Sequence, residues 1–333
     1  MANTSYGSIS QRTAAWAADE MLAHAMPIEL LGGMGQQKPI PKNTADNAKF
    51  RRPIPFPAAL APLTEGVTPP SKAMQYQDVS VQLQQYGDIV EITDKVQDMA
   101  EDPVLKDATG LIGEQVAETK ESLIWGTLRG GTSVYYTNGS ARSAVNTAIT
   151  LNAIRAAVRF LKSQRAQTIT QKISASTSYA TAPVAPAYVA VGHTDIEADL
   201  RAISQFVPVE NYASQGGVLP YEVGKVEGVR FCLSPLLTPF TDAGGNPGGT
   251  MKYTSNAGAA DVYPILIFGK DAFGQTMLRG ANAVTPMVLN PGEPRGGDPL
   301  GQRGTVGWKT YFAAVRLNES WMVRIEAAVT KLP

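Results

Sequence analysis

Apolar residues recur at helical spacing from Leu105 to Leu123. Asp102 suits the N-cap of this helix, and Pro103 occupies the first helical position, where proline is favoured. The glycine pair at 130–131 would end it. A helix of this span would be about 40 Å long, which suits a structural spine better than a core helix. Its stripe comprises Leu105, Ala108, Ile112, Val116, Thr119 and Leu123.

A second helix is predicted over residues 147–164, where Leu151, Ile154, Val158 and Leu161 form the apolar stripe. Short strands and helices then alternate and predict a compact α+β middle region. They lie at 187–191, 195–206, 228–232 and 262–268.

The two ends of the chain have simpler patterns. Residues 1 to about 30 predict a loose arm with a weak helix at 14–26. Two strand-like runs, 306–317 and 321–329, come last, and the turn at 318–320 predicts that they pair antiparallel.

Proline occupies every second position of one short stretch, at Pro53, Pro55 and Pro57. Alternate N–H groups of a strand point to the same edge, so these prolines would leave one edge without donors. The other edge can pair with residues 78–84, where apolar and polar side chains alternate. The pattern predicts a long hairpin with one edge protected from further pairing.

The tip of this hairpin is turn-rich, contains Leu63 and Glu65, and is followed by Lys72. An isolated two-stranded ribbon is marginally stable in water, so the hairpin needs a support. The support is either its own domain or a neighbouring subunit, and the pattern leaves both open. In the second case Leu63, Glu65, Lys72 and the three prolines form part of an inter-subunit contact.

Composition favours a protein that covers its surface with copies of itself. Charged residues make up 17% of the 333 residues, against about 25% in a typical soluble protein. The formal net charge is zero, which argues against tight, sequence-independent nucleic-acid binding. The N-terminal region does not resemble a signal peptide, and no apolar run approaches membrane length. We therefore expect a protein that is cytosolic when made and has no membrane partner.

Residues suited to catalysis or metal binding are sparse. The sequence has two histidines, His24 and His193, and one cysteine, Cys232, so neither a zinc cluster nor an internal disulfide is expected. The glycine-rich run at 244–249 lacks the lysine of a phosphate-binding loop. We expect no catalytic residue, no cofactor and no metal site, and a protein that is not an enzyme.

Charge is divided sharply along the chain. Residues 91–121 hold nine acidic and three basic residues, whereas residues 122–194 hold seven basic residues and no acidic one. Either both segments are ordinary solvated faces, or they form opposite flanks suited to head-to-tail contacts between subunits. On the second interpretation, Arg155, Arg159 and Lys162 face Glu114, Glu118 and Glu121 of an adjacent subunit. A competing interpretation turns the basic helix toward packaged DNA.

Nine short segments, in this order and spacing, resemble one known family. They are 37–42 (QKPIPK), 62–69 (PLTEGVTP), 85–88 (QYGD), 102–104 (DPV), 113–115 (GEQ), 224–231 (GKVEGVRF), 268–273 (FGKDAF), 298–304 (DPLGQRG) and 307–309 (GWK). The chain resembles the major capsid proteins of tailed bacteriophages with the Hong Kong 97-like fold, in particular the branch typified by phage N-four.

The resemblance implies an α+β capsid fold with five parts. These are an N-terminal arm (1–49), an extended β-hairpin or E-loop (50–85), a peripheral domain with the spine helix (86–145), an axial domain (146–299) and return strands of the peripheral domain (300–333). It also implies self-assembly into hexamers and pentamers of an icosahedral head around double-stranded DNA, which the shell contacts weakly. The protein would lie in the virion capsid, and in the host cytoplasm during assembly.

Other implied partners are the portal protein and separate scaffolding or decoration proteins. Some relatives cross-link the shell through a Lys–Asn bond. Lys72 is the one lysine near the hairpin tip, but no motif supports a partner for it, so we expect no cross-link. The alternatives are an encapsulin-like protein compartment, which uses the same fold around an enzyme cargo, and an oligomeric α+β enzyme.

Overall fold

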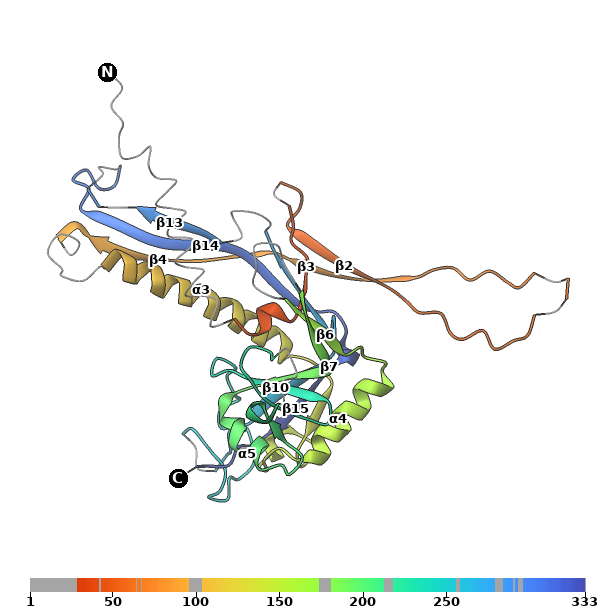
Figure 1. Cartoon of the computed structure of the whole chain (residues 1–333). Helices are drawn as coiled ribbons and strands as arrows, with labels where there is room; N and C mark the ends of the chain where they lie inside the picture. Colours follow the sequence, from red (N-terminus) through yellow and green to blue (C-terminus); the bar gives the residue numbers. More distant parts are fainter. Residues whose placement is uncertain are drawn as a thin grey trace.

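The computed structural model describes residues 29–41, 43–63, 65–66, 68–95, 104–173, 181–212, 218–255, 258–278, 284–289, 291–292 and 296–332. The predicted arm helix at 14–26, Asp102 and Pro103 lie outside these residues. Figure 1 shows a long helix beneath one sheet, a second sheet with its own helices, and a hairpin that projects away from both.

The first sheet has five strands and is covered on one face by the long helix α3 (Val104–Leu128). Ile112 and Val116 of α3 pack against Trp308 and Val306 of the sheet, which confirms the predicted apolar stripe at these positions. The strands are β1 (Gln36–Gln37), β4 (Gln84–Thr93), β12 (Phe273–Met277), β13 (Val284–Leu289) and β14 (Arg303–Arg316).

The second sheet has eight strands, and its central strands are buried along their whole length. Helix α4 (Leu151–Ser163) packs on it through Ile154, Val158 and Leu161, and the Thr150 hydroxyl caps the helix by accepting from Ala153 N. The strands are β5 (Val134–Tyr136), β6 (Ile169–Ile173), β7 (Thr181–Gly192), β8 (Val207–Pro208), β9 (Glu222–Val226), β10 (Val229–Leu233), β11 (Tyr263–Phe268) and β15 (Met322–Ala327).

Short helical segments complete these two units. They are α5 (Glu197–Arg201) and the 3₁₀ turns η2 (Leu31–Gly33), η3 (Arg142–Ala144), η4 (Thr194–Ile196), η5 (Val209–Asn211) and η6 (Glu319–Trp321).

The two final strands do not pair with each other, so that prediction is wrong. β14 lies between β4 and the β12–β13 edge of the first sheet, whereas β15 lies between β5 and β11 of the second. The turn at 318–320 therefore carries the chain from one sheet to the other. The expected ranges 146–299 and 300–333 do not coincide with the two sheets, because β12 and β13 join the first and β15 joins the second.

The hairpin consists of β2 (Asn47–Pro53) and β3 (Tyr76–Gln82), paired antiparallel from Asn47 with Gln82 to Pro53 with Tyr76. It continues through Leu83 into β4, so its second strand is covalently continuous with the first sheet. Beyond the paired part, the chain runs out and back in an extended form, which makes up the outer part of the hairpin (Figure 1).

Candidate assembly surfaces

The base of the hairpin is seated on the body by a small apolar cluster. Ala48 and Phe50 of β2 are buried there, together with Ile40 and, partly, Leu317. Gly274 of β12 lies beneath the Phe50 ring, and a Cβ at this glycine would stand 2.9 Å from the ring. The seat covers one face of β2 and ends at Phe50, since Arg51, Arg52 and Pro53 are exposed.

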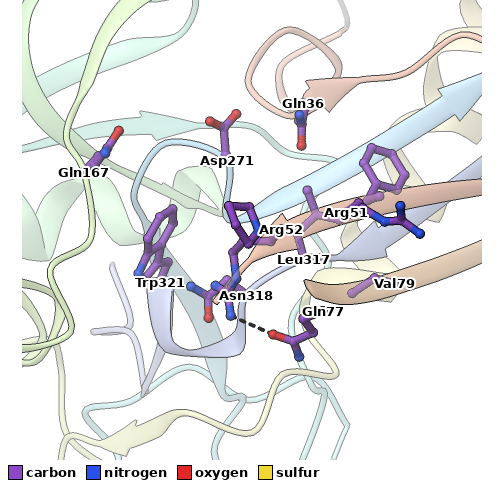
Figure 2. Close-up of a pocket in the computed structure, with 12 residues that line it drawn as sticks. Gln36, Arg51, Arg52, Gln77, Val79, Gln167, Asp271, Leu317, Asn318 and Trp321 are labelled. Atoms are coloured by element: carbon purple, nitrogen blue, oxygen red, sulfur yellow. Dashed lines mark hydrogen bonds between the residues drawn. The ribbon is translucent and has the colours of Figure 1, made fainter. Parts of the chain in front are cut away.

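A cavity of about 250 Å³ lies where the hairpin leaves the body (Figure 2). Arg52 crosses it, with its guanidinium over the Trp321 ring at 6.0 Å and its Nη2 donating to Gln77 Oε1 at 2.8 Å. On the outside of the hairpin, Arg51 donates to both Asp78 carboxylate oxygens at 2.8 and 3.0 Å and lowers the pKa of Asp78. The contact of Arg52 with Trp321 joins the hairpin base to the body of its own subunit. The other two contacts join the two strands of the hairpin to each other.

The predicted role of the prolines is correct for one residue only. Pro53 is the last residue of β2, and its nitrogen faces away from β3 because the next residue, Ile54, donates to Gln75 O across the ladder. Pro55 and Pro57 lie beyond the strand, where there is no ladder to protect. The paired part of the hairpin ends as the proline run begins.

The outer part of the hairpin, beyond Pro53, carries large apolar side chains that the rest of the subunit leaves exposed to solvent. Leu60 is 90% exposed and Leu63 is 76% exposed. Glu65 and Lys72 are exposed as well, without an ion pair among the described residues. The other exposed apolar residues of this outer part are Ile54, Phe56 and Met74. An apolar stripe of this length in solvent is typical of a surface that another protein covers.

The basic helix α4 presents Arg155, Arg159 and Lys162 to solvent. Arg155 already has a partner in its own chain, since its guanidinium lies 2.7 Å from Glu227 Oε1. Glu227 is held at the turn between β9 and β10, where it and Gly228 both have positive φ. No ion pair involves Arg159 or Lys162 within the part of the chain that the structure describes.

The three acidic residues predicted to meet this helix differ in position. Glu118 is exposed and Glu114 is half-buried on α3. Glu121 is fully buried, so its expected place on an inter-subunit surface is wrong. Its carboxylate accepts the Leu31 N–H at 2.9 and 3.1 Å, and burial raises its pKa to about 7. Glu121 lies on the inner face of α3, where the N-terminal arm covers it.

A further apolar surface was missed from the sequence. On the face of the first sheet away from α3, Ile89 and Met287 flank Gly307 in register and are 60% and 47% exposed. Leu289 is also exposed on the same strand. Residues 284–289 (VTPMVL) do not alternate between apolar and polar side chains, so the sequence pattern gave no clear signal for this strand.

The residues considered for chemistry are structural. Cys232 is buried in β10, which raises its pKa, and the pKa of His193 is lowered by its own burial. His193 accepts from Asp195 N and caps η4. The described residues contain no group of three or more side chains that could hold a metal ion. None of the described helices is long and apolar enough to cross a membrane.

Comparison with known proteins decides among the alternatives. A family model described as phage capsid protein matches residues 76–325. The chain belongs to the phage capsid protein family. This membership makes it a major capsid protein of tailed phages, a structural component of the virion capsid, and does not favour the encapsulin-like compartment or the oligomeric enzyme. No curated protein matches the sequence. The narrower placement in the N-four-like branch stays a prediction.

Solved capsid structures share the fold of this capsid protein. The capsid of Ralstonia phage GP4 has a TM-score of 0.64 at 15% identity, covering 90% of this chain and 88% of that chain. The capsid of cyanophage P-SCSP1u has a TM-score of 0.60 at 14% identity, with the same coverage. The head structure of Helicobacter pylori bacteriophage KHP40 has a TM-score of 0.60 at 10% identity, covering 99% and 93%. The Hong Kong 97-like fold, with arm, projecting hairpin and spine helix, is thereby confirmed.

Proposed function

We propose that the chain assembles into the hexamers and pentamers of an icosahedral phage head through its projecting hairpin, which lies on a neighbouring subunit. The observation that carries the proposal is the uncovered apolar stripe beyond Pro53, with Leu60 and Leu63 almost free of contacts. The apolar surface of this outer part of the hairpin is removed from solvent only when a second molecule covers it.

A hairpin that projects from one side of the subunit favours assembly of the subunits into rings. The outer part of the hairpin in one copy and the surface that it covers on the next copy are different surfaces. The contact is therefore heterologous and repeats around a closed ring. The covered length extends from Pro53 through Pro55, Pro57, Leu63 and Glu65 to Lys72. A subunit that hides so much apolar surface against copies needs few charges, in agreement with the low charged fraction.

Charge supports a second contact between subunits. Arg159 and Lys162 stand exposed on α4, and Glu118 stands exposed on α3, with Glu114 half-buried one turn away. We place these two sets opposite each other across a subunit boundary. Arg155 belongs at the edge of this contact, because it is paired with Glu227 of its own chain.

The remaining partners follow from the role of a head shell. The shell would enclose double-stranded DNA and contact it weakly, in line with a net charge of zero. It would meet a portal protein at one vertex, and scaffolding or decoration proteins during or after assembly in the host cytoplasm. A cross-link through Lys72 is not part of the proposal.

Electron microscopy of the full-length protein, produced alone and together with its phage partners, tests the proposal. We expect rings or closed shells. The variant Leu60→Asp/Leu63→Asp should prevent them while the far-ultraviolet circular dichroism of the subunit stays unchanged, and Leu63→Met, which keeps the apolar surface, should assemble. A monomer under all these conditions, or normal shells from the double aspartate variant, would contradict it.

A further inference from the structure

The N-terminal arm is attached to the spine helix α3 at one short segment, residues 29–33, here called the arm anchor. Leu30 and Leu31 of the anchor are buried, at 2% and 0% exposure. They pack against the C-terminal part of α3, at Ile124, Trp125 and Leu128. Apolar burial of two leucines contributes on the order of a few kcal/mol. Release of the anchor would detach residues 29–33 from α3, while β1 stays paired with β12 in the first sheet.

A carboxyl group lies inside this apolar contact. Glu121 is fully buried, and both of its side-chain oxygens accept from Leu31 N, at 2.9 and 3.1 Å. A buried carboxylate is costly unless a cation or several donors compensate it. The backbone amides of Leu30, Leu31 and Gly32 in the anchor are its hydrogen-bond donors. The ionisation of Glu121 and the position of the anchor are therefore coupled.

The charged groups around Glu121 give it no cation. On the arm side stands Glu29, and on α3 stands Lys120, whose ammonium pairs with Glu29 at 3.8 Å. β12 contributes the neutral Gln275, which donates to Gly32 O, and Gln37 beside it does the same at 3.1 Å. Among the described residues, no ion pair involves Glu121. The neighbouring Glu29 adds a like charge, which raises the pKa of Glu121 further.

We propose that Glu121 is a proton-dependent latch of the arm: the protonated side chain keeps the anchor seated on α3, and loss of the proton loosens the anchor. The proposal concerns the subunit itself and does not depend on how the hairpin assembles. It gives the anchor a conformational response to pH near neutrality.

The sign follows from the pKa. Burial is the largest cause and raises the pKa of Glu121 from 4.5 to about 7, with a further rise from Glu29 and an opposing effect of the Leu31 amide. An acid whose pKa is higher in the seated state stabilises that state at low pH. The stabilisation declines as pH rises above 4.5 and is lost once pH passes about 7. Linkage between these two pKa values makes anchor opening roughly 70-fold more favourable at pH 8 than at pH 5.

Hydrogen exchange of the Leu31 amide measures this opening directly. The protection factor, which removes the intrinsic pH dependence of exchange, is measured between pH 5 and pH 8 on the full-length chain. In the wild type we expect it to fall roughly 70-fold across this range. Amides of β11, which is buried along its whole length, should keep constant protection and serve as the internal reference.

Two variants separate the latch from general effects of pH. Glu121→Gln keeps the shape and one acceptor but cannot ionise, so its Leu31 protection should stay constant from pH 5 to pH 8. Glu118→Gln, an exposed change on the same helix, should behave as the wild type. A wild-type protection factor that is flat with pH, or an equal fall in Glu121→Gln, would overturn the proposal. Should Glu121→Gln fail to fold, the wild-type profile and a carboxyl ¹³C titration of Glu121 still decide it, because a pKa near 4.5 would exclude the latch.

Discussion

Glu326 of β15 is fully buried and holds two arginines. Arg142 donates to both of its oxygens at 2.8 and 2.7 Å, and the nearly buried Arg324 lies 2.8 Å from one of them. The Arg142 guanidinium also stacks on the Phe240 ring at 3.5 Å. This cluster fixes the loop before α4 to strand β15 of the second sheet.

Removal of this carboxylate should be among the most destabilising single changes in the subunit. Glu326→Ala leaves Arg324 buried without a counter-charge, so we expect a loss of about 3–5 kcal/mol in the free energy of unfolding. Urea denaturation followed by circular dichroism measures it. The control Glu197→Ala removes an exposed pair with Arg201 and should cost less than about 1 kcal/mol. Equal losses in the two variants would mean that the Glu326 cluster is not a source of stability.

At the scale of elements, the hairpin has two parts with different supports. Its base, through Ala48 and Phe50, belongs to the core of its own subunit. Its outer part beyond Pro53 has no cover from that core, as the exposure of Leu60 and Leu63 shows. Its own domain therefore supports the base, and support of the outer part by a neighbouring subunit stays a prediction.

Deletion within the outer part should separate folding from assembly. Removing residues 61–73 and joining the strands by a short turn should leave the circular dichroism and the melting temperature of the subunit nearly unchanged, because every described residue of this range is exposed. Shells should be absent in electron micrographs. As a comparison, Phe50→Ala at the base should cost about 3–5 kcal/mol of stability. If the deletion unfolds the subunit, the outer part contributes to its own core.

At the scale of the whole molecule, the exposed bases of α4 and the acids of α3 lie in different units of the subunit (Figure 1). Single exposed ion pairs contribute at most about 1 kcal/mol. Repeated around a ring of identical subunits, they also steer the direction of docking. The same exposure is compatible with a basic helix that faces packaged DNA, and one experiment distinguishes the two.

Charge reversal at this boundary should affect assembly and leave the subunit folded. Arg159→Glu/Lys162→Glu should slow or prevent shell formation, and the added reversals Glu114→Lys/Glu118→Lys should partly restore it. Light scattering during assembly measures the rate, and 1 M salt should slow the wild type, since screening reduces the reach of charges to about 3 Å. A basic helix facing DNA would instead give normal shells that fail to package the genome, with no rescue by the acid reversals.

The sequence by itself determined those features that depend on neighbouring residues. The apolar stripes of α3 and α4 and the alternation in strand β3 of the hairpin follow local periodicity, because helical and extended backbones place side chains at fixed spacings. Tertiary structure alone decided which strands pair across the chain. It separated β14 from β15 and buried Glu121 beneath the arm. Strand partners and burial are set by packing between segments far apart in sequence, so a local turn at 318–320 or a run of acidic residues does not reveal them.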